Sequence, residues 1–238
     1  MVDDIQGILE EHLGPRQGFE THPFRIGDYN AKVSSKFSLP FEGDSLGFAL
    51  ISTPSMFEKT FLPYLISSST NIEEASSPMD PLDECMRTTV NKVIHHHLIG
   101  ADDIRHPILF LHDFEIHPNR RPKILVQTAG HVSGSVRLYQ APGYNPVCLH
   151  PLYGGWFALR GALFFPNIQY DDSPKEPPNI LQSKEEIHNL LELFNDHWRD
   201  ARYRDVIPVK EKYSPLQRLY FETLPVDRIK LLRKFKVL

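Results

Sequence analysis

The sequence predicts an α+β fold, although an α/β arrangement also fits the pattern of segments. Apolar stretches at 46–53 and 107–116 have the length and composition of buried strands. Patterns typical of helices lie around them, and the chain after residue 183 is helical in pattern. With 238 residues, 41% of them hydrophobic and 24% charged, the chain is expected to fold as a globular protein.

The first half of the chain is predicted to contain a helix at 1–13, a strand at 46–53, a Ser-rich connection at 67–79, a second helix at 80–98 and a second strand at 107–116. Apolar residues of the first helix share one face, and Gly14-Pro15 ends it. Asp80 and Pro81 are an N-cap and first-turn pair, so they predict the start of the second helix.

The second half is predicted to contain a helix at 123–140, strands at 147–151 and 156–165, a Pro-rich linker at 171–178 and a long helix at 183–198. Ser183 and Glu186 match the capping-box pattern at the start of the long helix. Short helices are expected from Ser214 and from Pro225. The linker suggests three parts: an α+β core, a connection and a helical C-terminal part, at residues 1–170, 171–182 and 183–238.

Net charge and cysteine content exclude several classes of protein. The formal net charge is −4, so no overall positive field would attract nucleic acid or anionic lipid. No apolar run approaches the roughly 18 residues of a membrane span, and the acidic start is unlike a targeting peptide. Only Cys85 and Cys148 occur, which excludes a disulfide framework and matches no zinc pattern. We therefore expect a cytoplasmic protein with no nucleic-acid or membrane partner.

The segment 148–161 contains the most unusual combination of residues in the chain. It joins a thiol at Cys148, the pair Gly154-Gly155, two aromatics and Arg160. A positive neighbour could favour the thiolate of Cys148 and make it a nucleophile, but a single cysteine is more often a small buried side chain. Arg160 follows an apolar run, so it would need an anionic partner if buried.

Other arginines lie near aromatic residues and fit either of two interpretations. They could bind a carboxylate or phosphate, or they could stack on aromatic rings and face solvent. These arginines are Arg199, Arg202, Arg204 and Arg228. The run His95-His96-His97 is interpreted as a polar surface rather than a metal site, since successive residues do not share one helical face.

The predicted helix at 123–140 is unusually rich in small residues. Ala129, Gly130, Ser133 and Gly134 lower its helix propensity, so something close should occupy that face. A neighbouring helix is one candidate, and a large flat ligand is the other.

Three motifs in register closely resemble the cblC-type family of cobalamin-processing proteins, also called the methylmalonic aciduria and homocystinuria type C family. They are FEIHPNRRPKIL at 114–125, VCLHP and GGWFALRG within 147–161, and HWRD at 197–200. The likeness extends from Gly18 to Arg228 in the same order, over nearly the whole chain. Motifs this long and this rare make the resemblance specific.

The resemblance implies a flavin-nitroreductase-like α+β fold and an enzyme of vitamin B12 processing. Members of the family bind cobalamin in a base-off state and remove its upper ligand. They decyanate cyanocobalamin with electrons from reduced flavin, FAD or FMN, and dealkylate alkylcobalamins with glutathione. The product would pass to a cobalamin-trafficking partner and to downstream methionine synthase. A non-catalytic cobalamin chaperone and a flavin-dependent reductase of small molecules remain as alternatives.

The resemblance also assigns residues of this chain to two ligands. The expected cobalamin contacts are Asp113, Ile124, Leu125, Val126, Gln127, Leu138, Tyr139, Gln140, Cys148 and Leu159. The expected glutathione-binding arginines are Arg160, Arg204 and Arg228. The helical C-terminal part would complete this pocket, and the small face of 123–140 would lie under or beside the corrin.

His131 is a further candidate for cobalamin contact. It begins an H-x-x-G sequence, part of the D-x-H-x-x-G signature of proteins that ligate cobalt through histidine, but Ala129 stands in place of the Asp. Without that carboxylate to orient the imidazole, a packed His131 is favoured over an axial ligand. We expect no direct protein ligand to metal, because cobalt arrives within cobalamin, and we expect the attacking thiol to come from glutathione.

Overall fold

The computed structural model describes residues 1–67, 80–99, 107–172 and 175–235. Its main helices are α1 (Val2–His12), α2 (Ile26–Asn30), α4 (Pro81–Val93), α5 (Val126–Val132), α6 (Lys184–Asp196), α7 (Pro215–Glu222) and α8 (Arg228–Lys234). Its strands are β1 (Phe19–Arg25), β2 (Ser45–Ser52), β3 (Leu109–His112), β4 (Arg137–Tyr139), β5 (Val147–Leu149) and β6 (Ala158–Gln169). Within these residues no helix is long and apolar enough to cross a membrane.

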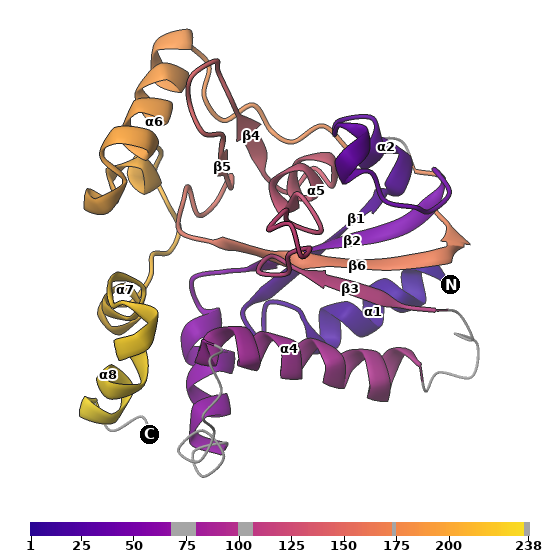
Figure 1. Cartoon of the computed structure of the whole chain (residues 1–238), viewed down its shortest axis with the longest axis horizontal. Coiled ribbons are helices and arrows are strands. Elements are labelled where there is room, and N and C mark those ends of the chain that lie inside the picture. The colour runs from indigo at the N-terminus through magenta and orange to yellow at the C-terminus, as the bar shows by residue number, and fades with distance from the viewer. Residues whose placement is uncertain (68–79, 100–106, 173–174, 236–238) are drawn as a thin grey trace.

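Four strands form an antiparallel sheet in the order β1-β2-β6-β3, and β4 pairs with β5 in a separate ribbon. Helices α1 and α4 cover one face of the sheet, and α2 and α5 cover the other (Figure 1). Helices α6, α7 and α8 stand at one end of the sheet (Figure 1). The mixed architecture with an antiparallel sheet agrees with the predicted α+β class.

Most predicted elements are confirmed where the structure describes them. The Asp80 side chain caps α4 by accepting from the Leu82 amide at 2.9 Å. The Ser183 and Glu186 capping box opens α6 as expected. The strand predicted at 107–116 is shorter, because β3 covers only Leu109–His112. The Ser-rich connection at 67–79 lies almost wholly outside the described residues.

The prediction of one helix over 123–140 is wrong in its second half. Helix α5 ends at Val132, and Gly134 then takes a φ of 78°, a conformation that favours glycine. The hydroxyls of Ser133 and Ser135 each donate to the Gly130 carbonyl at 2.9 Å, so side chains replace helix hydrogen bonds there. The chain thus turns from α5 directly into β4.

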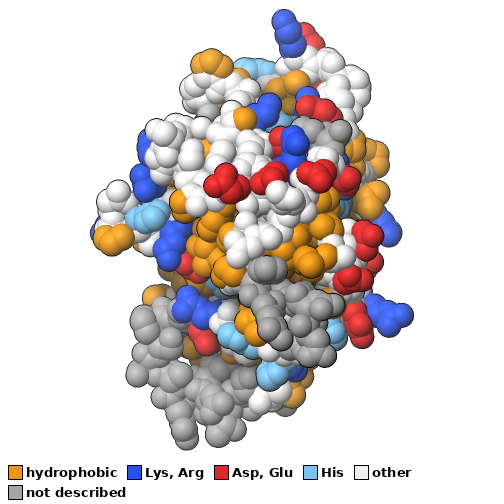
Figure 2. Space-filling model, turned by 90° about the vertical axis from the view of Figure 1, so that its right-hand side faces the viewer, with side chains coloured by type: hydrophobic (Ala, Val, Ile, Leu, Met, Phe, Trp, Pro, Cys, Tyr) orange, Lys and Arg blue, Asp and Glu red, His pale blue; other side chains and the backbone are white. Residues whose placement is uncertain are grey.

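On the side where α1 begins, the described residues form no continuous basic area (Figure 2). Hydrophobic side chains gather in the middle of this face, while acidic side chains gather above them and along one flank (Figure 2). Lysines and arginines are scattered around the rim of the same face (Figure 2).

Candidate functional site

Arg160 lies in a β-bulge of β6, at the end of the sheet that faces α7 and α8. The register of β2 with β6 shifts there, since Leu50 pairs with Gly161 and Ile51 pairs with Leu159. Gly161 has a φ of 141°, and a Cβ on it would lie 2.2 Å from the Leu111 carbonyl oxygen. Successive side chains of a strand point to opposite faces of the sheet. Leu159 therefore packs against Gly130 of α5, while Arg160 lies on the face that α4 covers.

The side near α5, which we call the apolar side, contains Cys148, Leu138, Leu159, Ile51 and Phe157. Cys148 and Leu138 are paired residues of β5 and β4. The Cys148 Sγ donates weakly to the Gln127 carbonyl oxygen at 3.9 Å, which ties β5 to α5. Cys148 is buried, and burial raises the pKa of its thiol to about 12. The thiolate interpretation is therefore wrong, and a small buried side chain is the role that the structure supports.

The small residues of α5 pack against the protein itself. A Cβ at Gly130 would lie 2.7 Å from Leu159 Cδ2 and 2.8 Å from Val136 Cγ2. Ala129 is fully buried in a core cluster with residues of α2 and the sheet. The expectation that this face lies under or beside the corrin is therefore wrong for Ala129 and Gly130, since Leu159 and Val136 already occupy the space.

The other expected cobalamin contacts are placed unevenly. Leu125, Val126 and Gln127 are partly exposed at the start of α5, while Ile124 is buried. The Gln127 amide donates to the Pro146 carbonyl at 3.1 Å. Tyr139 is turned away from Cys148, because it belongs to a cluster with α6 and its hydroxyl accepts from the Leu181 amide.

Two further candidates from the cobalamin set are Gln140 and His131. Gln140 is exposed beyond the end of β4. His131 is partly buried, burial lowers the pKa of its imidazole, and the Nδ1 atom has no hydrogen-bond partner. A neutral, packed histidine agrees with the favoured interpretation.

The opposite side of Arg160, which we call the charged side, contains Arg160, Arg228, Asp80, Asp83 and Asp113. Arg160 is only 6% exposed, and its Nε donates to Ser52 Oγ at 2.8 Å. The positive charge of Arg160 acts on the carboxyls of Asp83 and Asp113, and its backbone oxygen accepts from the Asp113 amide at 3.2 Å. Thus Asp113, expected at cobalamin, and Arg160, expected at glutathione, are neighbours.

Arg228 closes the charged side from α8. It pairs with Asp80, and its Nε donates to the backbone oxygens of Tyr220 and Thr223 at 3.1 Å. The Tyr220 hydroxyl also donates to Asp80 at 2.8 Å. Half-buried Arg228 therefore fastens α7 and α8 to the start of α4, and the same arginine acts electrostatically on Asp83.

Arg204 lies in an adjacent cleft and not within the charged side itself. Its guanidinium donates to the Gly155 carbonyl and lies 5.3 Å, 5.0 Å and 5.2 Å from the ring centres of Trp156, Tyr203 and Tyr213. This cleft of about 210 Å³ is also lined by Trp198, Arg199 and Arg218. The structure therefore groups Arg160 with Arg228, while Tyr213 and Phe221 separate Arg204 from them.

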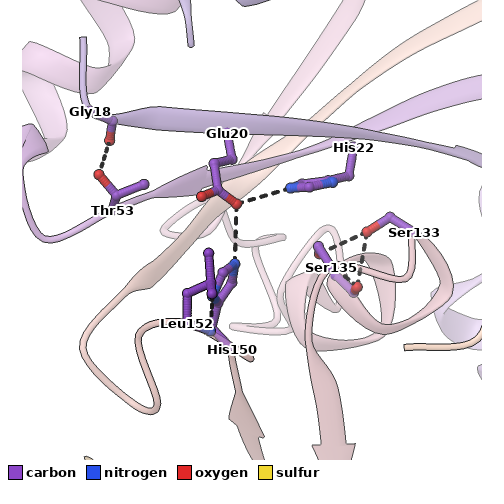
Figure 3. A network of polar contacts seen from close by, with 9 residues as sticks. Gly18, Glu20, His22, Thr53, Ser133, Ser135, His150 and Leu152 are labelled. Carbon is purple, nitrogen blue, oxygen red and sulfur yellow. Dashed lines mark hydrogen bonds and ion pairs between the residues drawn. The ribbon is translucent and has the colours of Figure 1, made fainter. Parts of the chain in front are cut away.

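A polar network that sequence reasoning missed supports the apolar side from β1. Glu20 Oε2 lies 3.1 Å from His150 Nε2 and 3.1 Å from His22 Nε2 (Figure 3). Burial raises the pKa of Glu20, but the hydrogen bonds with His150 and His22 lower it by more. The net shift of the pKa is therefore downward. The Leu152 amide donates to His150 Nδ1 at 3.1 Å, so the proton of a neutral His150 lies on Nε2.

The network holds the turn that follows Cys148. His150 and Gly154 exchange backbone hydrogen bonds of 2.8 and 2.9 Å, and the His150 ring stacks on Tyr153 at 4.6 Å. The only sequence signal was His150 beside Pro151, and β1 carries a mixed, half-polar sequence that did not predict a strand. Long-range pairing between residues 20 and 150 leaves no local pattern.

Comparisons with known proteins give one consistent result. The model of the methylmalonic aciduria and homocystinuria type C family matches residues 18–232. A chicken protein named cyanocobalamin reductase / alkylcobalamin dealkylase is 42% identical, covering 98% of this chain and 97% of its own length. The human protein of that name is 38% identical, over 97% of this chain and 82% of its length. The crystal structure of the Caenorhabditis elegans B12-trafficking protein CblC matches with a TM-score of 0.83 and 31% identity, over 98% of this chain and 95% of that one.

Proposed function

The chain belongs to the methylmalonic aciduria and homocystinuria type C family, and from that premise we propose that it is a cobalamin-processing enzyme, a cyanocobalamin reductase and alkylcobalamin dealkylase. Its full-length relatives carry that name. Cobalamin would bind base-off against the apolar side, with Leu125, Val126, Gln127, Leu138 and Leu159 as the residues best placed to meet it. The protein would supply shelter from water and orientation, while the redox chemistry belongs to the cobalt of its substrate.

The observation that carries the thiol half of the proposal is the buried guanidinium of Arg160. Arg160 is only 6% exposed, yet among the residues that the structure describes no carboxylate oxygen lies within 4.0 Å of its guanidinium nitrogens. A buried cation without an ion-pair partner is costly, so an anionic ligand is the expected complement. Glutathione carries two carboxylates and would meet this need, with Arg228 as a further contact on the charged side. Arg204, which the resemblance also assigns to glutathione, lies in the adjacent cleft.

The proposed dealkylation is a thiolate attack on the alkyl group. The glutathione sulfur forms a bond to the cobalt-bound carbon, the cobalt–carbon bond breaks, and its electron pair stays on the cobalt as cob(I)alamin. A free thiol titrates near 8.5, so nearby guanidinium groups would favour the reactive thiolate. No side chain of the chain is needed as a nucleophile, which agrees with the protonated, buried thiol of Cys148.

For decyanation we propose reduced flavin, FAD or FMN, as an electron donor that visits the site. One electron reduces the cobalt, and cyanide leaves. The flavin-nitroreductase-like type of sheet, the division at 171–182, the cytoplasmic location and delivery to a trafficking partner and methionine synthase belong to the same proposal. The name of the worm structure, a B12-trafficking protein, supports the delivery step for that relative.

A spectrophotometric titration tests the proposal. Protein is added to methylcobalamin, the base-off shift is recorded, and glutathione is then added anaerobically. We expect a base-off spectrum followed by formation of cob(I)alamin. A shift without dealkylation, combined with unchanged cyanocobalamin under reduced flavin, would identify a chaperone. No shift at all, with reduction of small organic substrates by bound flavin, would identify the unrelated reductase.

A further inference from the structure

A second pocket lies between α4 and β3 and shares no described lining residue with the apolar side or the charged side. Its volume is about 350 Å³, which is large enough for a small organic molecule. Helix α4 runs along the sheet in the direction opposite to β3, so its first half lies toward the end of β3 (Figure 1). The turn η3 (Ile94–Leu98), which continues α4, lies toward the start of β3. The pocket therefore has two ends of different character.

One end of the pocket contains two side chains with unused hydrogen-bonding groups, Arg87 and His112. His112 is only 4% exposed, and among the described residues neither its Nδ1 nor the buried Nε of Arg87 has a hydrogen-bond partner. Both side chains contact Phe114. The rings of His112 and Phe114 stack with their centres 4.6 Å apart, and Arg87 Cζ lies 5.6 Å from the centre of the same Phe114 ring. Since buried polar groups are nearly always satisfied in folded proteins, two unsatisfied groups in one pocket point to a ligand.

The charges at this polar end favour an anion. Glu115 is the one carboxylate among the described lining residues, and Lys123 pairs with it at 2.7 Å. Arg87 has no ion pair within the described part of the chain, so its charge is unopposed. Burial lowers the pKa of His112 to about 4, so its imidazole is neutral at pH 7. One cation beside one neutral imidazole matches a ligand with a single negative charge.

The other end of the pocket is apolar. Ile94, Ile99, Ile108 and Leu109 line it. Ile99 is 49% exposed and Leu109 is 40% exposed, although both are large hydrophobic side chains. A hydrocarbon chain that covered them would remove apolar surface from water, which is favourable. The ligand that fits both ends is therefore anionic at one end and aliphatic at the other.

We propose that the pocket between α4 and β3 binds a small aliphatic monocarboxylate, with its carboxylate at Arg87 and His112 and its chain against Ile99 and Leu109. A guanidinium group binds a carboxylate through two parallel hydrogen bonds, and a neutral imidazole with its proton on Nδ1 donates one more. A phosphate dianion would bring a second charge without a second free cation and would leave the apolar end uncovered. This site goes beyond the proposed cobalamin chemistry and does not depend on it.

An NMR titration of the full chain with sodium hexanoate tests the proposal. Hexan-1-ol has the same chain without the charge, and acetate has the charge without the chain. We expect hexanoate to bind at least about tenfold more tightly than either, because only hexanoate uses both ends of the pocket. The resonances that move should include the amides of Leu109 and Phe110 and the ring of His112.

Two matched variants locate the carboxylate. Arg87→Gln removes the cation of the pocket, while Lys92→Gln removes an exposed cation of the same helix that does not line it. Arg87→Gln should bind hexanoate at least about tenfold more weakly than wild type, since a charge-assisted hydrogen bond has that strength. Lys92→Gln should bind it as wild type does.

Three results would overturn the proposal. They are equal binding of hexanoate and hexan-1-ol or no binding of hexanoate by wild type, wild-type affinity in Arg87→Gln, and shifts that leave out His112 and Leu109. Circular dichroism checks that Arg87→Gln is folded. If it is not, Arg87→Lys, which keeps the charge, should bind hexanoate with intermediate affinity, and the comparison of the three probes in wild type decides.

Discussion

Gly130 offers a direct test of how the small residues of α5 are used. In Gly130→Ala the new methyl group would lie 2.7 Å from Leu159 Cδ2 and 2.8 Å from Val136 Cγ2. Overpacking of this kind costs about 1–3 kcal/mol, whereas replacing a helical glycine by alanine gains about 0.5–1 kcal/mol. We therefore expect the free energy of unfolding to fall by about 1 kcal/mol, within limits of about zero and 2.5.

Gly7→Ala is the matched control, because Gly7 lies within α1 and a Cβ there meets nothing within 4 Å. It should gain about 0.5–1 kcal/mol. Urea denaturation followed by circular dichroism measures both changes as shifts of the midpoint. If Gly130→Ala proved as stabilising as Gly7→Ala while cobalamin binding weakened, the small face would be open to the ligand, and the packing derived from Leu159 would be refuted.

Three further predictions concern Cys148, His112 and Glu20. Cys148→Ser should keep glutathione-dependent dealkylation, because burial raises the pKa of the Cys148 thiol to about 12. For the same reason iodoacetamide should label Cys148 of wild type slowly at pH 7.5. Labelling at the rate of a free thiol would contradict this. Burial lowers the pKa of His112 from 6.5 to about 4, so only the unfolded state takes up this proton as the pH falls through 6.5. The free energy of unfolding of wild type should therefore fall by about 3 kcal/mol by pH 4, a loss that His112→Gln should not show. Parallel curves of unfolding free energy against pH for the two proteins would argue against this. Glu20→Gln should lower the free energy of unfolding by about 1–3 kcal/mol, because it weakens the hydrogen bond that holds His150. It should also speed hydrogen exchange at the Leu152 amide, which donates to His150. An unchanged exchange rate would show that the network does not hold the turn.

The sequence predicted those parts of the fold that have local signals. The N-cap at Asp80 and the capping box at Ser183 set the starts of α4 and α6, and side-chain chemistry within three residues decides both. The apolar sequences of β2 and β6 predicted buried strands, because helices cover both faces of the sheet. Strand β1 escaped prediction, since its sequence is half polar and contains Pro23.

The site was harder to predict because contacts between distant segments decide it. The motif at 148–161 pointed to Arg160 as a buried cation, and the structure places it so. Leu159 and Arg160 lie on opposite faces of the sheet, and their positions depend on the pairing of β6 with Ile51 and Leu50 of β2. Glu20 gave no signal for its contact with His150, because the two residues are 130 positions apart along the chain.

The central claim is that cobalamin and the thiol bind on opposite faces of β6, at Leu159 and at Arg160. Methylcobalamin titration of Arg160→Ala, followed by glutathione, tests it most directly. Arg160 lies on the charged side, so we expect the base-off spectrum and the cobalamin Kd of wild type, together with a loss of at least about tenfold in the dealkylation rate at limiting glutathione. Loss of cobalamin binding and of dealkylation to the same extent would contradict the division.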